Sequence, residues 1–530
     1  MIATFLVVIH IAGIASAVHA IMHTRTEQGA VAWGISLVAF PYVAVPAYWF
    51  LGRSRFGGYV TARRLSEDLG EDLLADTRER VNPYRLTDSE LDQALMAAQR
   101  LVDQPMLTGN AVELLVDGQA TFNSILAGID AANDYILFQF FIVKDDLIGR
   151  TVKERLIARA RLGVQVWFLY DELGSHSLPA AYLDELRDAG IQVSAFNTRK
   201  GPGNRFQINF RNHRKVVVVD GRVAWVGGHN VGDEYLGRDP EFGHWRDTHV
   251  RIEGPSALGA QLSFVEDWHW ATDQVLELEW VPHVAPDGDT GVLILPTGPA
   301  DELESASLMF THAINNARER IWIASPYFVP DHGLLHALQL AGLRGVDVRI
   351  LIPDMPDHYL VYLAAFSYLE NAGLTGVRFF RYTDGFLHQK VMLIDDRMAT
   401  IGTANFDNRS FRLNFEITAA IARNPAFISE VEAMLENDFA HAREVPPDEL
   451  SGKPWWFRFA VSVARLTAPV TTACAPAVTM TNPRAISASG GMRVLIASID
   501  SRRSTRAASS SLMSGTPLTR DRISQEFRSP

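Results

Sequence analysis

The first part of the chain alternates between two long apolar stretches and one short polar loop. Residues 1–22 and 30–51 contain no Asp, Glu, Lys or Arg. Each stretch is long enough to cross a bilayer as a helix of about 20 residues. Trp33, Tyr48 and Trp49 lie near the ends of the second stretch, where interfacial aromatic side chains are typical. The pattern predicts two transmembrane helices within residues 1–52.

Two other structures fit the same pattern less well. A cleavable signal peptide is one, but the first stretch lacks the basic residues that normally precede a signal's apolar core, and the second stretch would still anchor the chain. A buried helical hairpin is the other. The loop between the stretches carries one arginine, Arg25, and residues 53–64 carry four. This bias predicts that the large C-terminal part is cytoplasmic.

The pattern changes after the apolar stretches. Residues 53–110 are polar and predict a helical connector. From residue 111, apolar runs typical of buried strands, such as YILFQFFIV and KVVVVDG, alternate with helical stretches, which indicates an α/β fold. From residue 289 the same order returns, as the pair AANDYILFQFFIVKD and ARERIWIASPYFVPD illustrates. We expect two homologous α/β halves, residues 111–288 and 289–450, packed as one unit with pseudo-two-fold symmetry.

The C-terminal part has a different composition. Residues 451–474 include WWFRFAVSVARLTAP, which predicts either an amphipathic helix on a membrane surface or a helix packed on the catalytic body. Residues 475–530 are rich in Ser, Ala and Thr and contain few large apolar residues near the end, so we expect this tail to be disordered.

Composition limits the chemistry. The only cysteine, Cys474, excludes an intramolecular disulfide and a cluster of thiolate metal ligands. The net charge of −12 argues against a surface that coats nucleic acid. No carboxylate cluster has the spacing of metal ligands, so neither a metal nor a cofactor is expected. Lysine is scarce, with six lysines among 49 basic residues, and two of the six belong to the repeated motif described next.

The strongest signal is a motif that occurs twice. NHRKVVVVDGRVAWVGGHN spans residues 212–230 and LHQKVMLIDDRMATIGTAN spans residues 387–405. The matched positions, which all keep the same offset, are His213 and His388, Lys215 and Lys390, Asp220 and Asp395, Gly227 and Gly402, and Asn230 and Asn405. Core strands alone would explain the valines and glycines. They would not explain a histidine and a lysine at the mouth of each strand.

The spacing of the motif suggests its chemistry. A His and a Lys two residues apart point to the same side of a strand. If the halves converge, two imidazoles and two ammonium groups face one cleft, which suits an anionic phosphorus centre with a leaving alcohol. The lysines would stabilise phosphate oxygens, one histidine would attack phosphorus, and the other would move protons. Asp220 and Asp395 are counted with the catalytic motif, although their opposite parity favours a local role in fixing the turn.

The doubled pattern H-x-K-x4-D-x6-G-[GT]-x-N resembles the phospholipase D superfamily. More narrowly, NHRKVVVVDGRVAWVGGHNVGDEY, HWRDTHVRIEGP and NFDNRSFRLNFE, after two apolar stretches, resemble its bacterial cardiolipin synthase branch. The likeness extends to about residue 470. It implies that a phosphatidyl group moves from one phosphatidylglycerol to the primary hydroxyl of another, with release of glycerol. It also implies a multi-pass protein of the bacterial inner membrane, with lipids rather than nucleic acid as partners.

The resemblance also assigns residues. It implies that His213 is the nucleophile that forms a phosphohistidine and that His388 is the general acid and base, although the duplication makes the two hard to distinguish. The remaining residues implied near the site are Asp247 and Glu416, as the carboxylates behind the histidines, Asn230 and Asn405, as amide donors, and Arg409, as a phosphate contact. In the second copy, Thr403 stands where the first copy has Gly228.

Several alternatives stay open at this stage. A phospholipase D hydrolase would use the same site with water as acceptor. A nuclease of the same superfamily fits poorly with the acidic charge, and a non-catalytic lipid scaffold fits poorly with the intact motifs. The basic residues Arg199, Lys200, Arg205 and Arg211 indicate either a rim that guides anionic headgroups or a solvated loop. Arg214 is predicted to point away from the cleft.

Overall fold

The computed structural model of the chain describes residues 2–24, 27–52, 56, 59, 76–87, 93–196, 209–446 and 448–471. The tail predicted to be disordered, residues 475–530, lies outside the described residues. So do Arg199, Lys200 and Arg205 of the predicted basic rim.

The N-terminal apolar stretches form three helices: α1 (Ile2–His23), α2 (Glu27–Ala39) and α3 (Pro41–Leu51). The second predicted span is not one helix. It breaks at Phe40, whose φ of −135° and ψ of 56° are not helical. The next residue is a proline, which has no N–H to continue the helical hydrogen bonds. Among the described residues, only Thr4–His23 is long and apolar enough to cross a membrane as a single helix. Of the two predicted transmembrane helices, the structure has one candidate in α1, while the second apolar stretch forms two shorter helices, so a second span stays a prediction.

The three helices pack as a folded-back hairpin, in which α1 contacts both α2 and α3. Polar side chains of this hairpin pair with one another. The His19 ring lies 2.7 Å from the Tyr48 hydroxyl, and the Trp49 indole N–H donates to the Ser16 hydroxyl at 3.0 Å. Most apolar side chains of α1 are exposed, for example Ile11, Ile14 and Ile21. This outer surface is therefore apolar, as a lipid-facing surface requires.

The connector contains a short 3-10 helix η1 (Asn82–Tyr84) and helix α5 (Gln93–Val102). The first half then contains β1 (Leu107–Val116), α6 (Asp117–Ala131), β2 (Tyr135–Phe140), α7 (Leu147–Arg161), β3 (Gln165–Asp171), α8 (Ala180–Asp188), β4 (Gln192–Phe196), β5 (Arg211–Asn212), β6 (Val216–Val219), β7 (Val223–Gly227), η2 (Asp233–Leu236), β8 (Trp245–Arg246), β9 (Thr248–Glu253) and α9 (Ala257–Thr272). Its first strand begins slightly before the predicted boundary at residue 111.

The second half contains β10 (Thr290–Thr297), α10 (Ser305–Asn316), β11 (Arg320–Ala324), β12 (Phe328–Val329), α11 (His332–Leu343), β13 (Asp347–Pro353), α12 (Tyr359–Gly373), β14 (Arg378–Tyr382), β15 (Phe386–Leu387), β16 (Val391–Ile394), β17 (Met398–Gly402), β18 (Phe406–Asp407), α13 (Asn408–Arg412), β19 (Asn414–Ala422), α14 (Pro425–Ala440) and β20 (Ala442–Glu444). Helix α15 (Trp455–Thr471) follows.

Local chemistry explains these elements. The four valines of β6 are all buried, and β-branched residues favour a pleated, packed strand. Helix α7 begins after Asp146, whose carboxylate accepts the N–H of Gly149 at 3.0 Å, as a capping residue does. Helix α14 begins after Asn424, which caps it in the same way, and has a proline at its first position, where proline is favoured. The chain therefore carries its own start signals for the helices that separate the strands.

The strand order repeats across the two halves. In the first half the order is β1-β9-β7-β6-β2-β3-β4, and in the second it is β10-β19-β17-β16-β11-β13-β14, with β20 added at the edge. Strands β1 and β10 pair antiparallel and join the halves into one hydrogen-bonded path. Strands β2, β3 and β4, toward one end of this path, are parallel, and so are β11, β13 and β14 toward the other end. The predicted α/β fold with an internal repeat is confirmed.

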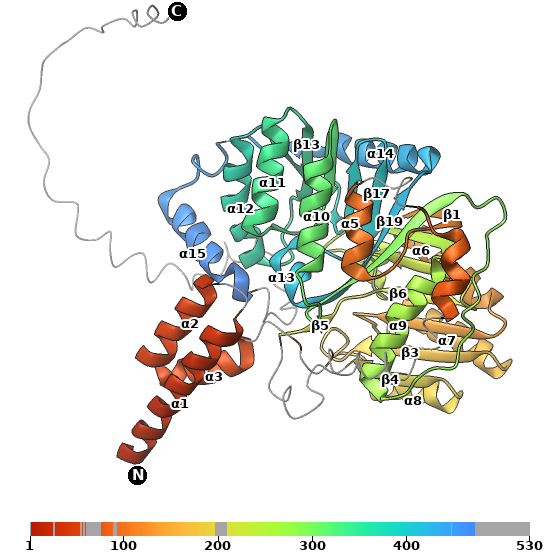
Figure 1. The fold of residues 1–530 in the computed structure, drawn as a ribbon, viewed down its shortest axis with the longest axis horizontal. Coiled ribbons are helices and arrows are strands. Elements are labelled where there is room, and N and C mark those ends of the chain that lie inside the picture. The colour runs from red at the N-terminus through yellow and green to blue at the C-terminus, as the bar shows by residue number, and fades with distance from the viewer. Residues whose placement is uncertain are drawn as a thin grey trace, which may run out of the picture. The chain divides into compact units, whose positions relative to one another are not determined.

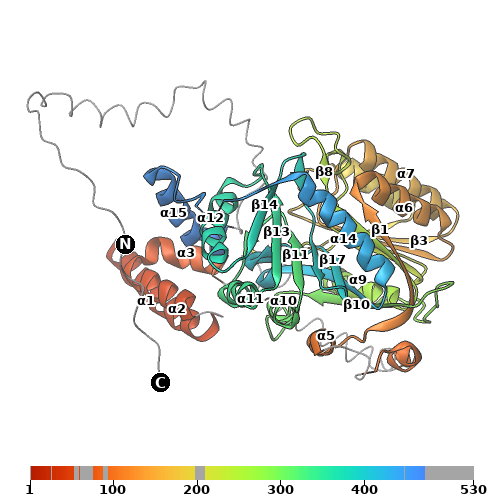
Figure 2. The same cartoon turned by 90° about the horizontal axis from the view of Figure 1, so that it is seen from above.

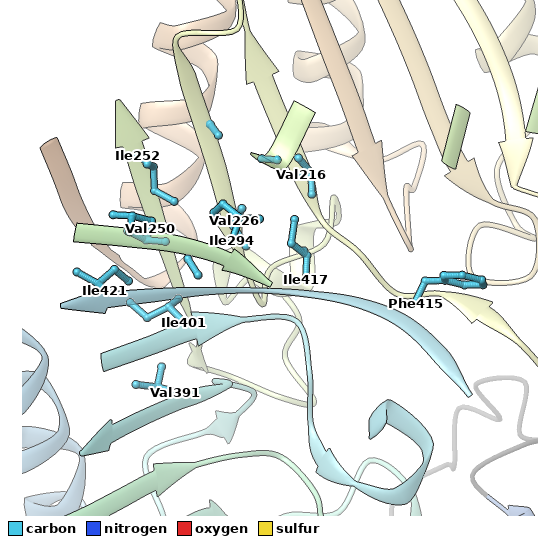
Figure 3. Packing of buried hydrophobic residues seen from close by; sticks show 14 of the residues in the cluster. Val216, Val226, Val250, Ile252, Ile294, Val391, Ile401, Phe415, Ile417 and Ile421 are labelled. Carbon is cyan, nitrogen blue, oxygen red and sulfur yellow. The ribbon is translucent and has the colours of Figure 1, made fainter. Parts of the chain in front are cut away.

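The two half-sheets face each other across a shared hydrophobic core. Strand β17 contacts both β7 and β9, although neither is its neighbour in the sheet. Figure 3 shows Val250 and Ile252 of the first half near Ile401 and Ile421 of the second. Each such side chain stabilises the fold by about 1.5–3 kcal/mol when fully buried. The common core fixes the positions of both motif-bearing strands.

Helices complete the layers around this core. Helix α9 packs on β6, β7 and β10, and α14 packs on β1, β16 and β17, so both contribute to the shared core. The other helices gather at the two flanks, where Figures 1 and 2 show α6 and α7 beside the first half and α10 and α11 beside the second. The layered body thus holds the two halves of the candidate site as parts of one packed unit.

Candidate active site

The histidine and lysine of each motif lie just before the buried strand, not within it. His213 and Lys215 lie in the link between β5 and β6, and His388 and Lys390 lie in the link between β15 and β16. All four residues are buried. The strand behind each link holds these groups in place, while the link itself leaves their side chains at the strand's mouth.

Each motif docks on the opposite half. Strand β5 of the first half pairs in parallel with β19 of the second, and the His213 N–H donates to the carbonyl of Phe415 at 2.9 Å. Strand β15 of the second half pairs in parallel with β8 of the first, and the His388 N–H donates to the carbonyl of Arg246 at 2.8 Å. In both cases the accepting residue directly precedes a carboxylate.

Those carboxylates complete two crossed pairs. The Nδ1 atom of His213 lies 2.9 Å and 3.1 Å from the two oxygens of Glu416, and Nδ1 of His388 lies 2.6 Å from Oδ2 of Asp247. Both carboxylates are fully buried. A carboxylate partner fixes the tautomer, with the proton on Nδ1. The Nε2 atom of each ring is therefore the one that carries a lone pair for chemistry.

The two carboxylates are supported differently. The Thr403 hydroxyl donates to Glu416 at 2.6 Å, and the Asn414 amide donates at 3.0 Å. At the position that matches Thr403, the first half has Gly228, where a Cβ atom would lie 2.0 Å from Oδ1 of Asp247. The shorter aspartate thus occupies the space that a side chain at residue 228 would need. Gly228 in the first motif therefore leaves room for Asp247, and Thr403 in the second motif supports Glu416.

The lysines and aromatic rings surround the histidines. The Lys215 ammonium donates to the carbonyl of His213 at 2.6 Å and lies 5.4 Å from the Phe141 ring centroid. The Lys390 ammonium likewise donates to the carbonyl of His388. Aromatic side chains flank both imidazoles, with ring centroids at 5.0 Å for Phe141 and His213, 5.2 Å for Trp245 and His388, and 6.2 Å for Tyr235 and His388.

Burial sets the protonation of the site. It lowers the pKa of His213 to about 4, because the effect of Glu416 only partly offsets the loss of solvation. Burial and the two lysines lower the pKa of His388 well below its usual value. Burial also lowers the pKa of Lys390 to about 8 and that of Lys215 well below its usual value. Both rings are therefore neutral near pH 7, and a bound anion would favour the charged form of both lysines.

Asp220 and Asp395 do not belong to this cluster. Each lies at the far end of its buried strand, in the left-handed region with φ of 52° and 48°. The Asp220 carboxylate accepts three backbone N–H groups at the start of β2, at 2.8 to 2.9 Å, and Asp395 accepts three at the start of β11. They are a strand length from the lysines, roughly 15 Å. Their inclusion among the catalytic residues is corrected, and their role is to hold neighbouring strands.

The other predicted site residues differ in the hydrogen bonds that they make. The amide of Asn230 donates to the Tyr235 hydroxyl at 2.9 Å, and its oxygen accepts the Ile142 N–H at 3.1 Å, so this side chain positions the aromatic wall beside His388. The Asn405 N–H donates to the Ser410 hydroxyl at 3.1 Å. Arg409 donates one N–H to the Asn209 carbonyl at 2.9 Å, while its buried Nη1 has no partner among the described residues. Arg409 therefore keeps a donor that could bind an anion.

Comparison with known proteins gives the geometry a context. The family described as "Cardiolipin synthase, PLD-like domain" matches twice, at residues 125–249 and 310–439. A protein of Pseudomonas putida strain F1 named cardiolipin synthase A is 48% identical over 465 residues, which cover 87% of this chain and 97% of the relative. One of the same name from Pseudomonas entomophila strain L48 is 48% identical over 467 residues, with the same coverage. The chain belongs to the cardiolipin synthase family of the phospholipase D superfamily.

A solved structure supports the fold of this family member. The chain resembles a phosphatidylserine synthase of Haemophilus influenzae Rd KW20 with a TM-score of 0.54 and 16% identity, over 72% of this chain and 100% of that one. At this identity the likeness concerns the fold. The double match within the family shows that the phospholipase D-like domain occurs twice.

Two buried ion pairs lie behind the site. Arg214 donates to Asp267 on α9 at 2.9 Å and to the backbone carbonyl of Glu416 at 3.1 Å. Arg246 donates to both oxygens of Asp438 on α14, at 2.7 and 2.9 Å. The parity of Arg214 correctly indicated that it points away from the cleft. Its partner could not be foreseen, because nothing in the local sequence marks a carboxylate on a distant helix.

The aromatic wall beside His388 was not predicted. Tyr235 and Trp245 lie inside the phrases that carried the family resemblance, NVGDEY and HWRD, so the signal for them was present. In the part of the chain that the structure describes, no group of three or more His, Cys, Asp or Glu side chains is arranged to hold a metal ion. The described residues of the site are two imidazoles, their carboxylates, two lysines and aromatic side chains.

Proposed function

We propose that this protein is a membrane-bound cardiolipin synthase, which transfers a phosphatidyl group from one phosphatidylglycerol to another and releases glycerol. Family membership makes it a phosphatidyltransferase of the phospholipase D type. The observation that carries the proposal is the pair of buried histidines, each backed by a carboxylate of the opposite half. Each also has a lysine two residues away, which supplies the positive charge that a phosphodiester needs.

In the first step, Nε2 of His213 attacks phosphorus. The P–N bond forms as the bond from phosphorus to the leaving glycerol oxygen breaks. His388, protonated once the anionic substrate has entered, gives its proton to that oxygen. Lys215 and Lys390 stabilise the charge on the non-bridging oxygens. Glu416 stabilises the positive charge that develops on the His213 ring. The products are free glycerol and a phosphatidyl group on His213.

In the second step the direction of proton transfer reverses. Neutral His388 takes the proton from the primary hydroxyl of a second phosphatidylglycerol. The resulting oxygen attacks phosphorus, and the bond to His213 breaks. Asp247 stabilises the charged form of His388 in both steps. The net reaction converts two molecules of phosphatidylglycerol into one of cardiolipin and one of glycerol.

The site assignment rests on position as well as on chemistry. His213 and His388 are equivalent in the duplicated motif, and the greater support of Glu416 favours His213 as the residue that holds the phosphatidyl group. Arg409, with its unpaired Nη1, is proposed as a further phosphate contact. Asn405 is proposed as a neighbouring polar group, whereas Asn230 acts through Tyr235.

The relatives' name implies association with membranes. Helix α1, which is apolar and long enough to span a bilayer, supports anchoring in the bacterial inner membrane. The folded-back α2 and α3 would return the chain to the side on which it began, and the arginines after residue 52 favour a cytoplasmic catalytic body. This arrangement is part of the proposal.

The test is direct. Purified full-length protein is incubated with phosphatidylglycerol in detergent without divalent cations, and lipids and glycerol are measured. Equal amounts of cardiolipin and glycerol support transfer. Phosphatidic acid with glycerol would instead indicate a phospholipase D hydrolase, the other activity that the site can perform.

The covalent step is tested with labelled substrate. A His388→Ala variant should be inactive in turnover, because both steps use its proton transfer, and the phosphatidyl adduct that it forms slowly should map to residue 213. A matched His213→Ala variant should form no adduct. An adduct that persists in the His213→Ala variant would contradict the assignment of the nucleophile, and full turnover by His388→Ala would contradict the mechanism.

A further inference from the structure

Helix α15 has three distinct sides. At about 100° per residue, Trp455, Phe459 and Leu466 fall on one side, where their side chains are 72%, 64% and 80% exposed. Val461 and Ala464 fall on the opposite side and are buried. The two arginines of the helix, Arg458 and Arg465, are exposed along one border of the apolar side.

The buried side fixes the helix on the catalytic body. Helix α15 packs on α12, where Phe457 lies against Phe366 with ring centroids 5.2 Å apart. The Lys453 ammonium lies 5.9 and 6.0 Å from these two rings. Val361 and Val329 complete this small core. The exposed apolar side is therefore held outward by a packed helix pair.

The same helix pair borders the site. Val329 is on β12, which pairs with β18 directly after Asn405 of the second motif. Tyr327 packs on the α12–α15 core and donates its hydroxyl to Asp357, whose charge opposes the lowering of the Lys390 pKa. A surface on α15 thus lies one helix layer from the second half of the site.

We propose that the outer side of α15, consisting of Trp455, Trp456, Phe459, Val463 and Leu466, inserts into the interfacial region of an anionic bilayer and holds the site at the membrane surface. This inference rests on the proposed function, since it takes the substrate to be a membrane lipid. It deepens that function by naming the surface through which the catalytic body meets the lipid.

Charge and composition favour a bilayer over a protein partner. Residues 455–471 contain no Asp or Glu, although the chain as a whole carries a net charge of −12. A local basic border beside exposed tryptophans complements anionic headgroups, and the long arginine side chains can extend to them while the apolar residues insert. Two adjacent tryptophans at one end suit the polar–apolar boundary of a bilayer.

The test uses a fluorescent reporter on the full chain. Cys474 is replaced by Ser, a single cysteine is introduced at Phe459, and the label 7-nitrobenz-2-oxa-1,3-diazole is attached. The protein is reconstituted into vesicles of phosphatidylcholine and phosphatidylglycerol that carry a nitroxide on part of the acyl chains. A matched control carries the label at Leu162, which is 73% exposed in the first half. We expect at least threefold stronger quenching at residue 459 than at residue 162.

Equal quenching at the two positions would overturn the proposal. The proposal would also be overturned if the label at residue 459 were shielded from solvent in detergent and this shielding increased with protein concentration. That result would indicate that a second copy of the chain covers the helix. Shielding that disappears after truncation at residue 472 would indicate that the chain's own tail covers the helix, and would overturn it too. These readouts need no turnover, so they stand whether or not the proposed transfer reaction is observed.

An activity arm then links the surface to catalysis. The triple variant Trp455→Ser, Phe459→Ser, Leu466→Ser should raise the apparent KM for phosphatidylglycerol in vesicles about tenfold. Its kcat on monomeric dihexanoyl phosphatidylglycerol should remain within twofold of the parent, because the substituted side chains are exposed and distant from the reacting atoms. Leu162→Ser should change neither value. An unchanged KM in vesicles would contradict the role, and an equal loss on the soluble lipid would contradict it as well, because the defect would then be structural.

Discussion

The bond between Glu416 and His213 offers the sharpest test of the mechanism. In Glu416→Gln, the size of the side chain is kept and its charge is removed. Both oxygens of Glu416 accept hydrogen bonds in the native site, from His213, Thr403 and Asn414. The amide of a glutamine must place an NH2 group opposite one of these donors. The histidine then loses the partner that fixes its tautomer and balances its developing charge.

The expected loss can be worked from the geometry. A hydrogen bond to a charged group is worth about 1.5–3 kcal/mol, and each step of about 1.4 kcal/mol changes a rate by about tenfold. This alone predicts a decrease of about 10- to 100-fold. Loss of the correct tautomer adds to it, since removing the charge of a comparable carboxylate behind a catalytic histidine costs about 10⁴. We expect kcat to fall by about 10²- to 10⁴-fold.

A single-turnover assay shows which of the two chemical steps becomes slower. With labelled phosphatidylglycerol, Glu416→Gln should slow both glycerol release and adduct formation on His213. Asp247→Asn should impair the proton transfers through His388, which both steps use, so we expect both the release of glycerol and the consumption of the adduct to slow. Glu154→Gln, at an exposed site, is the matched control and should behave like the parent.

Protonation offers no alternative explanation for such a loss. Glu416 raises the pKa of His213, so its removal lowers that pKa further below about 4, and the ring stays neutral at pH 7. A folded Glu416→Gln variant with kcat within threefold of the parent would refute the reasoning. Thermal unfolding within about 1 °C of the parent, equivalent to about 1 kcal/mol for a chain of this length, confirms that the variant is folded.

Four further predictions concern charged residues of the site and of the framework around it. Burial lowers the pKa of Lys390 to about 8, so its positive charge is lost as pH rises through that value. KM for phosphatidylglycerol should therefore rise above pH 8 in steady-state assays and should rise less in Lys390→Arg, in which only Lys215 of the two positions still loses its charge. Asp220→Ala and Asp395→Ala should each lower the free energy of unfolding by about 1–3 kcal/mol in denaturant melts, with kcat per folded molecule unchanged. Burial opposes ionisation of Asp395, but its backbone donors and Arg397 outweigh that effect and lower the pKa. The stability that Asp395 contributes is therefore present above its unfolded pKa and is lost as pH falls through the folded value. Asp267→Ala should cost about 3–5 kcal/mol, seen in the same melts, because it leaves the Arg214 guanidinium buried without its carboxylate.

The sequence predicted the fold where a local pattern carried it. The order of strands and helices and the repeat of that order were readable, because buried strands and amphipathic helices each have their own period. The break at Phe40 was not predicted, although the sequence has prolines at positions 41 and 46. The uninterrupted apolar run was interpreted as one membrane-spanning helix. Length and hydropathy alone do not separate one long helix from two short ones.

The candidate site was predictable to the extent that it lies in the motif. His213, Lys215, His388 and Lys390 stand together in the structure. The carboxylates were assigned by resemblance, but their crossed pairing depends on how two halves dock, which no local pattern encodes. Asp220 was grouped with the catalytic motif because it repeats with it, but it lies one strand length away and has the local structural role that its parity indicated.

The crossed pairing explains why the two halves form one site. A half alone would contain a histidine and a lysine but not the carboxylate that orients its ring, because Glu416 serves His213 and Asp247 serves His388. Duplication first makes such halves alike, yet the reaction needs one histidine to hold phosphorus and the other to move a proton twice. The exchange of Thr403 and Glu416 for Gly228 and Asp247 makes them unequal. Both carboxylates are bound through both oxygens, but Glu416 accepts two side-chain donors besides its histidine, whereas Asp247 accepts the backbone N–H of Thr248. The more heavily supported carboxylate suits the ring that must stay in line with phosphorus, so this difference between the halves favours His213 as the nucleophile.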